Sequence, residues 1–449
     1  MVNFQRYPKY KDSGVKWIGE IPEEWNIDRI KKSVTNLKNG IWGEEPQGDE
    51  NDVFCIRVAD FNRNNFEVED RDFTVRNLDK VKQKAYMLKK DDLLIEKSGG
   101  GEKQPVGFVV RYNLDKPAIY ANFMAKIELN KEIAYPNYFK YLYSSMYSHR
   151  INVRSIKQTT GIQNLDTSYY FQEIVPYPSI KEQKQIADFL DQKTSEIDSL
   201  IANKEKLIEL LEEKRQVIIT EAITKGLNPN VKMKDSGVEW IGEIPEGWGV
   251  SKIKYQADIN KYTLSENTDE DLEIKYIDIS SVNSRGEVVN IEKYYFKDAP
   301  SRARRILRKG DTIVSTVRTY LKAITWFEEV EENLICSTGF AVLSPKETIY
   351  PKYLFYLMRS TKYIDEIVKR SIGVSYPAIT STEIGMLECL LPNINEQKMI
   401  VEHIDNELKK IDGLVDEIKL QIQKLKEYRQ SLIYEAVTGK IDVRDYVRV

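Results

Sequence analysis

The chain has 449 residues, and 67 Lys and Arg against 70 Asp and Glu give a formal net charge of −3. At about 150 residues per domain, this length predicts two large or three smaller domains. Hydrophobic residues make up 41% and charged residues 31%, which excludes a largely disordered chain and a basic coat over the whole protein.

The composition also disfavours several kinds of site. Three scattered cysteines and two histidines, His149 and His403, are too few for a disulfide framework, a zinc cluster or a Ser-His-Asp triad. We therefore expect no metal site. The common nucleotide-binding, metalloprotease and hydrolase motifs are missing, so a self-contained enzyme is not expected. The start lacks an apolar signal core and no stretch approaches ~18 apolar residues, so we expect a cytoplasmic protein without membrane contact.

The chain contains an internal duplication. DSGVKWIGEIPEEW at 12–25 recurs as DSGVEWIGEIPEGW at 235–248, and EQKQIADFLD at 182–191 recurs as EQKMIVEHID at 396–405. The offset between matching segments falls from 223 to 214 residues, as small deletions in the second copy would produce. The two copies are expected to share a fold and to be related by a pseudo-two-fold axis.

The middle of each copy, 26–180 and 249–393, alternates short apolar strand patterns with turns and then carries a helical YPxYxxYL pattern. This predicts two α+β globular domains of about 150 residues each. These middles match less well than the ends, so we expect the two domains to differ in what they bind.

Each copy ends in a long predicted helix without proline, 182–224 and 396–438. Ser179 and Asn393 are the expected N-caps, and Gly226 and Gly439 the expected C-caps. Forty-three residues span roughly 64 Å. The predicted heptad seam consists of Leu190, Ile197, Leu211, Ile218, Ile404, Ile411, Ile418, Leu425 and Leu432. Ile186, Leu200, Leu207, Ile400, Leu414 and Tyr428 are assigned to its companion line. We favour an antiparallel coiled coil within the chain over separate packing of each helix on its own domain.

Positive charge and polar side chains gather in a few segments of each middle. The run SRARRILRKGDTIVSTVRTYLK at 301–322 contains one carboxylate, and none occurs between Glu132 and Asp166. Three consecutive glycines at 99–101 let the backbone approach a ligand closely. Such residues suit phosphates and base edges, although a solvated hairpin is the alternative. The predicted DNA contacts are Lys97, Ser98, Gly99, Gly100, Gly101, Lys103, Gln104, Arg154, Lys157, Gln158, Thr159, Thr160, Gln163, Asn164, Arg302, Arg304, Arg305, Thr316, Arg318, Thr319, Tyr320, Lys322, Ser375 and Tyr376.

The repeated tryptophans Trp17, Trp25, Trp240 and Trp248 are interpreted as packing against the long helices. A docking role is compatible with the same pattern, because two identical surfaces would bind two copies of one partner.

With these features, the whole chain resembles the specificity subunits of Type I restriction-modification systems. The similarity rests on the WIGEIPEEW and WIGEIPEGW pair, the segments IEKSGGGEKQPVG and STVRTYLKA, and the helices that begin EQKQI and EQKMI. It implies the following boundaries: an N-terminal segment 1–25, target-recognition domains 26–180 and 249–393, a central helix and linker 181–248, and a C-terminal helix 394–449.

The resemblance further implies a non-catalytic subunit that reads a bipartite, asymmetric site on double-stranded DNA. Two methyltransferase subunits would bind S-adenosylmethionine and methylate adenine N6, and two restriction and motor subunits would use ATP and Mg. This chain itself would hold no cofactor. The alternative is a coiled-coil scaffold that organises proteins without touching DNA. A related system with restriction and methylation fused in one partner would change only the partner's identity.

Overall fold

The computed structural model describes residues 4–159 and 161–446. Its contacts divide the chain into two compact units, each described here by itself. Unit 1 comprises Met1–Lys204 and Leu420–Val449, and unit 2 comprises Glu205–Lys419. Each unit therefore contains one globular part and a segment of both long helices, α4 (Ile180–Lys225) and α9 (Ile394–Val437).

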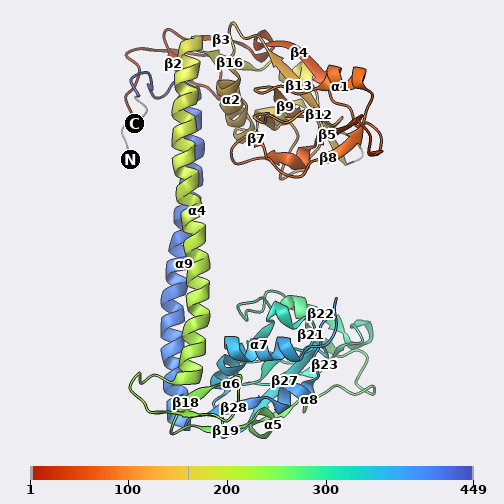
Figure 1. Ribbon diagram of the computed structural model, residues 1–449, viewed down its shortest axis with the longest axis vertical. Coiled ribbons are helices and arrows are strands. Elements are labelled where there is room, and N and C mark those ends of the chain that lie inside the picture. The colour runs from red at the N-terminus through yellow and green to blue at the C-terminus, as the bar shows by residue number, and fades with distance from the viewer. Residues whose placement is uncertain (1–3, 160, 447–449) are drawn as a thin grey trace. The chain divides into compact units, whose positions relative to one another are not determined.

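Unit 1 is built around a six-stranded sheet with the order β4-β13-β9-β11-β7-β6 and a three-stranded sheet with the order β12-β5-β8. Its strands are β1 (Tyr10–Asp12), β2 (Glu20–Pro22), β3 (Asn26–Arg29), β4 (Val34–Asn39), β5 (Asp52–Ile56), β6 (Phe61–Asn62), β7 (Glu67–Val68), β8 (Thr74–Asn77), β9 (Leu93–Glu96), β10 (Ser98–Gly99), β11 (Val109–Arg111), β12 (Ala118–Tyr120), β13 (Met124–Leu129), β14 (Ile156–Thr159), β15 (Ile162–Leu165) and β16 (Ile174–Tyr177). Its shorter helices are α1 (Lys80–Tyr86), α2 (Pro136–Ser148) and α3 (Thr167–Tyr170). Figure 1 shows α2 lying between the sheet and α4.

Unit 2 repeats this plan with two four-stranded sheets, β20-β27-β24-β25 and β22-β21-β26-β23. Its strands are β17 (Met233–Asp235), β18 (Glu243–Pro245), β19 (Gly249–Lys252), β20 (Ala257–Ile259), β21 (Glu273–Ile277), β22 (Glu292–Tyr295), β23 (Ala303–Ile306), β24 (Thr312–Ser315), β25 (Ile324–Trp326), β26 (Leu334–Ser337), β27 (Phe340–Pro345) and β28 (Glu388–Leu391). Its shorter helices are α5 (Ile253–Gln256), α6 (Pro351–Arg359), α7 (Thr361–Arg370) and α8 (Ser381–Met386). The predicted α+β class is confirmed in both units.

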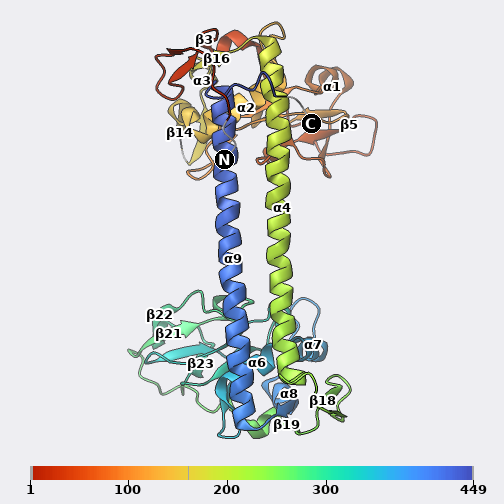
Figure 2. The same cartoon turned by 90° about the vertical axis from the view of Figure 1, so that its left-hand side faces the viewer.

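The long helices pair antiparallel, as predicted (Figure 2). In unit 1, Arg429 Nε lies 2.9 Å from Asp198 Oδ1, and Lys204 Nζ donates to Gln421 Oε1 at 2.5 Å. Residue numbers that rise along α4 thus meet falling numbers along α9. In unit 2, Arg215 and Asp412 form the equivalent ion pair at positions 214 residues away from Arg429 and Asp198.

Every predicted seam residue is buried or half-buried, but the companion line was right only at its first residue in each helix, Ile186 and Ile400, which are fully buried. Leu200 and Leu414 are each 49% exposed, and Leu207 and Tyr428 are exposed as well. The buried companions instead lie four residues after the seam positions, for example Ile201, Leu408, Val415 and Ile422. Leucines on either side of a seam look alike in sequence, and packing decides which side closes.

The caps, Trp25 and Trp248 behave as the sequence predicted. Glu182 N donates to Ser179 Oγ at 3.3 Å and Glu396 N to Asn393 Oδ1 at 3.0 Å. The C-caps Gly226 and Gly439 have φ of +69° and +70°. A Cβ at Gly439 would lie 3.1 Å from Trp25 Cη2, and one at Gly226 would lie 3.1 Å from Trp248 Cζ2. Trp25 and Trp248 therefore close over the ends of the long helices, whereas Trp240 packs edge-on against Tyr363 of α7.

The repeated EQK motif has a structural explanation. Gln183 is fully buried; its Oε1 accepts from Tyr135 N at 2.8 Å, and its Nε2 donates to Ile133 O at 2.8 Å and Pro178 O at 3.0 Å. Gln397 makes the same three bonds in unit 2. This glutamine therefore ties the globular part of each unit to a long helix, which positions the sheet edges described next.

Candidate nucleic-acid interface

In unit 1 the two predicted DNA-contact segments, far apart in sequence, lie side by side. Lys97 N and Ser98 N both donate to Phe123 O, at 2.8 and 3.1 Å. Ser98 and Gly99 then pair with strand β15 in the register Ser98↔Asn164 and Gly99↔Gln163. One three-stranded sheet, β10-β15-β14, thus joins the glycine loop to the 156–165 hairpin.

Unit 2 uses the same backbone frame with other side chains. Thr316 N donates to Gly339 O at 2.8 Å, which matches the bond from Lys97 N to Phe123 O in unit 1. Val317 forms a bridge with Ala378, and Arg318 N donates to Pro377 O at 2.8 Å. The segments 316–322 and 371–379 are therefore brought together as 97–104 and 156–165 are in unit 1.

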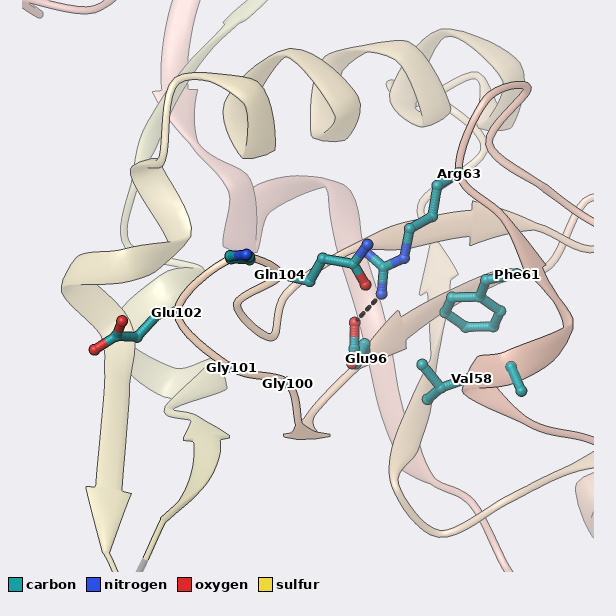
Figure 3. Close-up of a pocket in the computed structure, with 10 residues that line it drawn as sticks. Val58, Phe61, Arg63, Glu96, Gly100, Gly101, Glu102 and Gln104 are labelled. Carbon is teal, nitrogen blue, oxygen red and sulfur yellow. Dashed lines mark hydrogen bonds and ion pairs between the residues drawn. The ribbon is translucent and has the colours of Figure 1, made fainter. Parts of the chain in front are cut away.

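Beneath the glycine loop of unit 1 lies an open cavity of about 960 Å³ (Figure 3). Its lining includes Val58, Phe61, Arg63 and Glu96, together with the loop residues 100–104. Arg63 Nη2 and Glu96 Oε2 are 2.8 Å apart, and the two side chains point toward each other in the close-up. The Arg63 guanidinium also stacks over Phe108, 4.5 Å from the ring centroid.

Sequence reasoning missed this ion pair. Burial raises the pKa of Glu96, and Arg63 opposes the rise. A charged residue at the end of the otherwise apolar run at 93–96 was the signal that could have found it. Because the Glu96 side chain is only 3% exposed and already paired, the ion pair forms part of the cavity wall.

The glycine loop itself is constrained. Gly100 has φ of +62°, and a Cβ there would lie 2.9 Å from Val106 N and 3.0 Å from Gln104 O. Only glycine fits this turn without a shift. The loop can therefore bring bare backbone close to a ligand, as the sequence suggested.

The predicted contacts of unit 1 differ in how accessible they are. Exposed residues are Gly100, Lys103, Gln104, Arg154, Lys157, Gln158 and Asn164, and half-buried residues are Lys97, Ser98, Gly99 and Gly101. Thr159 belongs to β14, and Thr160 lies outside the described residues. Gln163 is only 6% exposed and its Oε1 accepts from Val106 N at 3.3 Å, so its side chain faces the interior.

Two of the unit 1 cations already have partners. Lys97 Nζ donates to Asn39 Oδ1 at 2.6 Å, and Lys157 Nζ lies 2.7 Å from Asp166 Oδ2. The hydrogen bond from Lys157 lowers the pKa of Asp166. Within the ranges 4–159 and 161–446, Lys103 and Arg154 form no ion pair, which leaves them freer to meet a phosphate.

The predicted contacts of unit 2 also separate into two groups. Arg302, Arg318, Tyr320, Lys322, Ser375 and Tyr376 are exposed, Arg304, Arg305 and Thr316 are half-buried, and Thr319 is buried. Arg304 stacks over Phe296 at 4.7 Å, and Arg305 Nη1 donates to Thr263 Oγ1 at 2.9 Å. Thr319 Oγ1 lies 2.9 Å from Ser371 Oγ, so this hydroxyl holds the loop in place.

The Arg318 side chain is exposed and is fixed by stacking. Its Cζ lies 4.6 Å from the centroid of the Tyr376 ring, and its φ is +53°. Among the residues that the structure describes, neither Arg318 nor Lys322 has a carboxylate partner. An exposed guanidinium fixed by stacking can bond two acceptors of a guanine edge, and an ammonium such as that of Lys322 suits phosphate.

Among the residues that the structure describes, no group of three His, Cys, Asp or Glu residues could hold a metal ion. All three cysteines are buried and unpaired, and His403 is exposed on α9 as expected. No described helix is long and apolar enough to cross a membrane.

Comparisons with known proteins agree with this geometry. The family model described as "Type I restriction modification DNA specificity domain" matches residues 22–211 and 245–424. The Type I restriction enzyme MjaVIII specificity subunit of Methanocaldococcus jannaschii is 26% identical over 97% of this chain and 98% of its own length. The EcoKI specificity subunit of Escherichia coli K12 is 22% identical over 94% of this chain and 90% of its own.

Solved structures show the same fold. A chain from a study of complex assembly and conformational transition of the type I R-M system superposes with a TM-score of 0.68 at 14% identity, covering 94% of this chain and 99% of that one. The HsdS subunit from Thermoanaerobacter tengcongensis gives a TM-score of 0.52 at 15% identity, covering 94% and 98%. With its specificity-domain match repeated over both copies of the duplication, the chain belongs to the Type I restriction-modification DNA specificity family.

Proposed function

We propose that this chain is the non-catalytic subunit that reads a bipartite DNA site for a Type I restriction-modification complex. Unit 1 reads one half-site and unit 2 reads the other. The observation that carries this proposal is the shared backbone frame of the two sites, which presents a glycine loop with Lys103 in one unit and Arg318 with Tyr376 in the other. The same backbone arrangement with different side chains is suited to reading two half-sites of different sequence.

In this function, exposed cations neutralise phosphates, while Arg318 and Gln158 are available to base edges. Asn164 accepts from Ser98 Oγ through its Oδ1 at 2.7 Å and can offer its amide N–H groups. The net charge of −3 gives the chain little general attraction for DNA. Binding by the chain alone is therefore weak, and the complex with its partners binds tightly. Equal gel-shift affinities with and without the methyltransferase subunit would contradict this expectation.

The partners are two methyltransferase subunits, which bind S-adenosylmethionine and methylate adenine N6 in each half-site. Two restriction and motor subunits that use ATP and Mg join them for cleavage. Apolar side chains that the paired long helices leave exposed support protein docking, because groups of exposed apolar side chains mark protein–protein contact sites. In unit 1 these are Leu200, Leu420 and Tyr428, and in unit 2 they are Leu207, Leu210, Val217 and Leu414.

The test separates DNA reading from scaffolding. Arg318→Ala in unit 2 and Lys103→Ala in unit 1 should leave assembly with the methyltransferase subunit unchanged and weaken DNA binding by the complex. Removing a phosphate contact should also reduce the slope of log affinity against log salt by about 0.9. Lys309→Ala is the control, since Lys309 is exposed but already paired with Glu329 at 2.5 Å.

Mapping methylated adenines made by each complex identifies the half-site that each unit reads. Arg318→Ala should relax sequence preference in one half-site, and Lys103→Ala should weaken binding without a change of preference. If the chain were a scaffold that does not touch DNA, neither effect would appear and every variant would still assemble with its partners.

A further inference from the structure

The candidate interface of unit 2 carries an apolar tip, residues 372–376, that the proposed phosphate and base contacts do not use. Ile372 is 81% exposed, Tyr376 is 61% exposed, and Val374 is fully exposed. Exposed aliphatic side chains at the end of a loop usually mark a contact surface.

The tip is a short closed hairpin. Ile372 N donates to Ala378 O at 2.9 Å, and Ala378 N donates to Ile372 O at 3.0 Å. Gly373, with φ of +121°, makes the turn possible. The aliphatic side chains are therefore presented on a bonded backbone that needs little further ordering on binding.

The tip is also fixed to the rest of the interface. Ile379 N donates to Thr316 O at 2.9 Å, and Arg318 N donates to Pro377 O at 2.8 Å. The Arg318 guanidinium stacks on the Tyr376 ring within the tip. The tip therefore lies beside any ligand group that the Arg318 side chain contacts.

The surroundings of the tip favour a polyanion. The segments 316–322 and 371–379, which form this edge, contain no Asp or Glu, and their charged residues are Arg318 and Lys322. An apolar tip inside a positive edge matches a nucleic-acid groove, in which phosphates flank the base edges.

A DNA groove offers few apolar groups to such a tip. The 5-methyl group of thymine is the apolar group of a base edge, and it lies in the major groove. Insertion of a side chain between stacked bases from the minor groove is the other known use of aliphatic residues. The stacked guanidinium of Arg318 next to the tip favours the major groove, where guanine presents two acceptors to arginine.

We propose that Ile372 and Val374 pack against the 5-methyl group of a thymine in the major groove of the half-site read by unit 2. This inference rests on the proposed DNA-reading function. Each half-site that is methylated on adenine necessarily contains an A·T pair, and hence a thymine methyl group.

Unit 1 has different side chains at the matching positions. At the positions 215 residues earlier it has Lys157 and Thr159 in place of Ile372 and Val374, and the aliphatic side chain that its hairpin exposes is Ile162, at 53% exposure. Substitution of Ile372 and Val374 should therefore abolish sensitivity to a thymine methyl group in the unit 2 half-site alone.

The experiment measures DNA binding by the complex with methyltransferase, after methylation mapping has given the site. Each thymine of the site is replaced in turn by deoxyuracil, which removes only the methyl group. For the wild type, one replacement in the unit 2 half-site should raise Kd about fourfold, as expected for one buried methyl-sized group. The Ile372→Ala/Val374→Ala double variant should bind the normal duplex more weakly and lose this sensitivity. Val289→Ala, which truncates another exposed valine of unit 2 (61% exposed), should retain it.

Three results would overturn the inference. One is a complex that binds its site specifically but responds to no deoxyuracil replacement. Another is a response that persists unchanged in the double variant. The third is fluorescence of a 2-aminopurine placed away from the methylated adenine that rises with saturating wild type and not with saturating variant, because unstacking at that position reports insertion between bases. Failure of the wild-type complex to prefer any sequence would instead refute the DNA-reading function itself.

Discussion

The buried glutamine in the first turn of each long helix allows a quantitative prediction of stability. Gln397 is fully buried in unit 2. Its Oε1 accepts from Tyr350 N at 2.7 Å, and its Nε2 donates to Pro392 O at 2.9 Å and Thr348 O at 3.3 Å. One side chain thus satisfies three backbone groups where α6 begins beside α9.

Gln397→Leu keeps the size of the side chain and removes all three bonds. Tyr350 N then loses its partner in a site closed to water, and an unsatisfied buried group costs about 1–3 kcal/mol. The two weaker carbonyl contacts add about 1 kcal/mol together. We expect unit 2 to lose about 3 kcal/mol of unfolding free energy.

Gln397→Glu separates hydrogen bonding from shape. The carboxylate can still accept from Tyr350 N, but it faces two carbonyl oxygens to which it cannot donate when ionised. Burial should raise its pKa in the folded state, so this variant should recover stability as the pH falls and the group becomes protonated. Gln397→Leu should show no such recovery.

Native-state hydrogen exchange followed by mass spectrometry measures this in the full chain, because it reads each unit separately. Peptides covering α6 and the start of α9 should lose protection in Gln397→Leu. Gln423→Leu is the control, since Gln423 is exposed on the same helix and donates to the side chain of Glu427 at 2.9 Å. A loss below about 1 kcal/mol, or one matched by the control, would refute the reasoning.

Three further predictions concern single groups. Arg429→Ala should destabilise unit 1 by about 2 kcal/mol. This cost is smaller than that of breaking a fully buried ion pair, because Asp198 can become hydrated again. A double-mutant cycle with Asp198→Ala should measure the coupling energy of the two side chains. Burial alone would raise the pKa of Glu67, but Lys140 and Arg111 outweigh burial and hold that pKa below 4.5. The stability that this network contributes is therefore present above pH 4.5 and is lost as the pH falls below that value. Glu67→Gln should flatten the drop in Tm between about pH 5 and pH 3 relative to wild type. Burial raises the pKa of Cys55 to about 12 and also that of the other two cysteines, so none should react with a thiol reagent at about pH 8 until the protein is denatured.

Much of the fold could be predicted because its signals are local or repeated. The caps Ser179 and Asn393, the αL glycines Gly226 and Gly439, and the seam spacing each depend on a few neighbouring residues. The duplication then supplied every expectation twice. The outward turn of Leu200 could not be read in the same way, because it depends on the side from which the second helix packs.

The candidate site was predictable as segments but not as an arrangement. Composition singled out the glycine loop and the polar run at 158–164, yet only the pairing of Ser98 with Asn164 shows that they form one surface. The same pairing turns Gln163 inward to Val106, although its type and position resemble those of its exposed neighbours. Alternation across a strand separates such neighbours, and its phase is set by tertiary pairing.

The backbone conformation of the two sites indicates which side chains the function requires. Gly99 has φ of +113°, while the residue at the matching position of unit 2 is Arg318 with φ of +53°. A side chain in this left-handed region costs about 1 kcal/mol, and such strain is typical of functional positions. Arg318→Gly would relieve the strain but enlarge the freedom of the unfolded chain, which costs about 0.5–1 kcal/mol. Its stability should therefore stay close to that of the wild type while DNA affinity falls. An Arg318→Gly protein that binds DNA normally would mean that the strained arginine serves the loop and not the duplex.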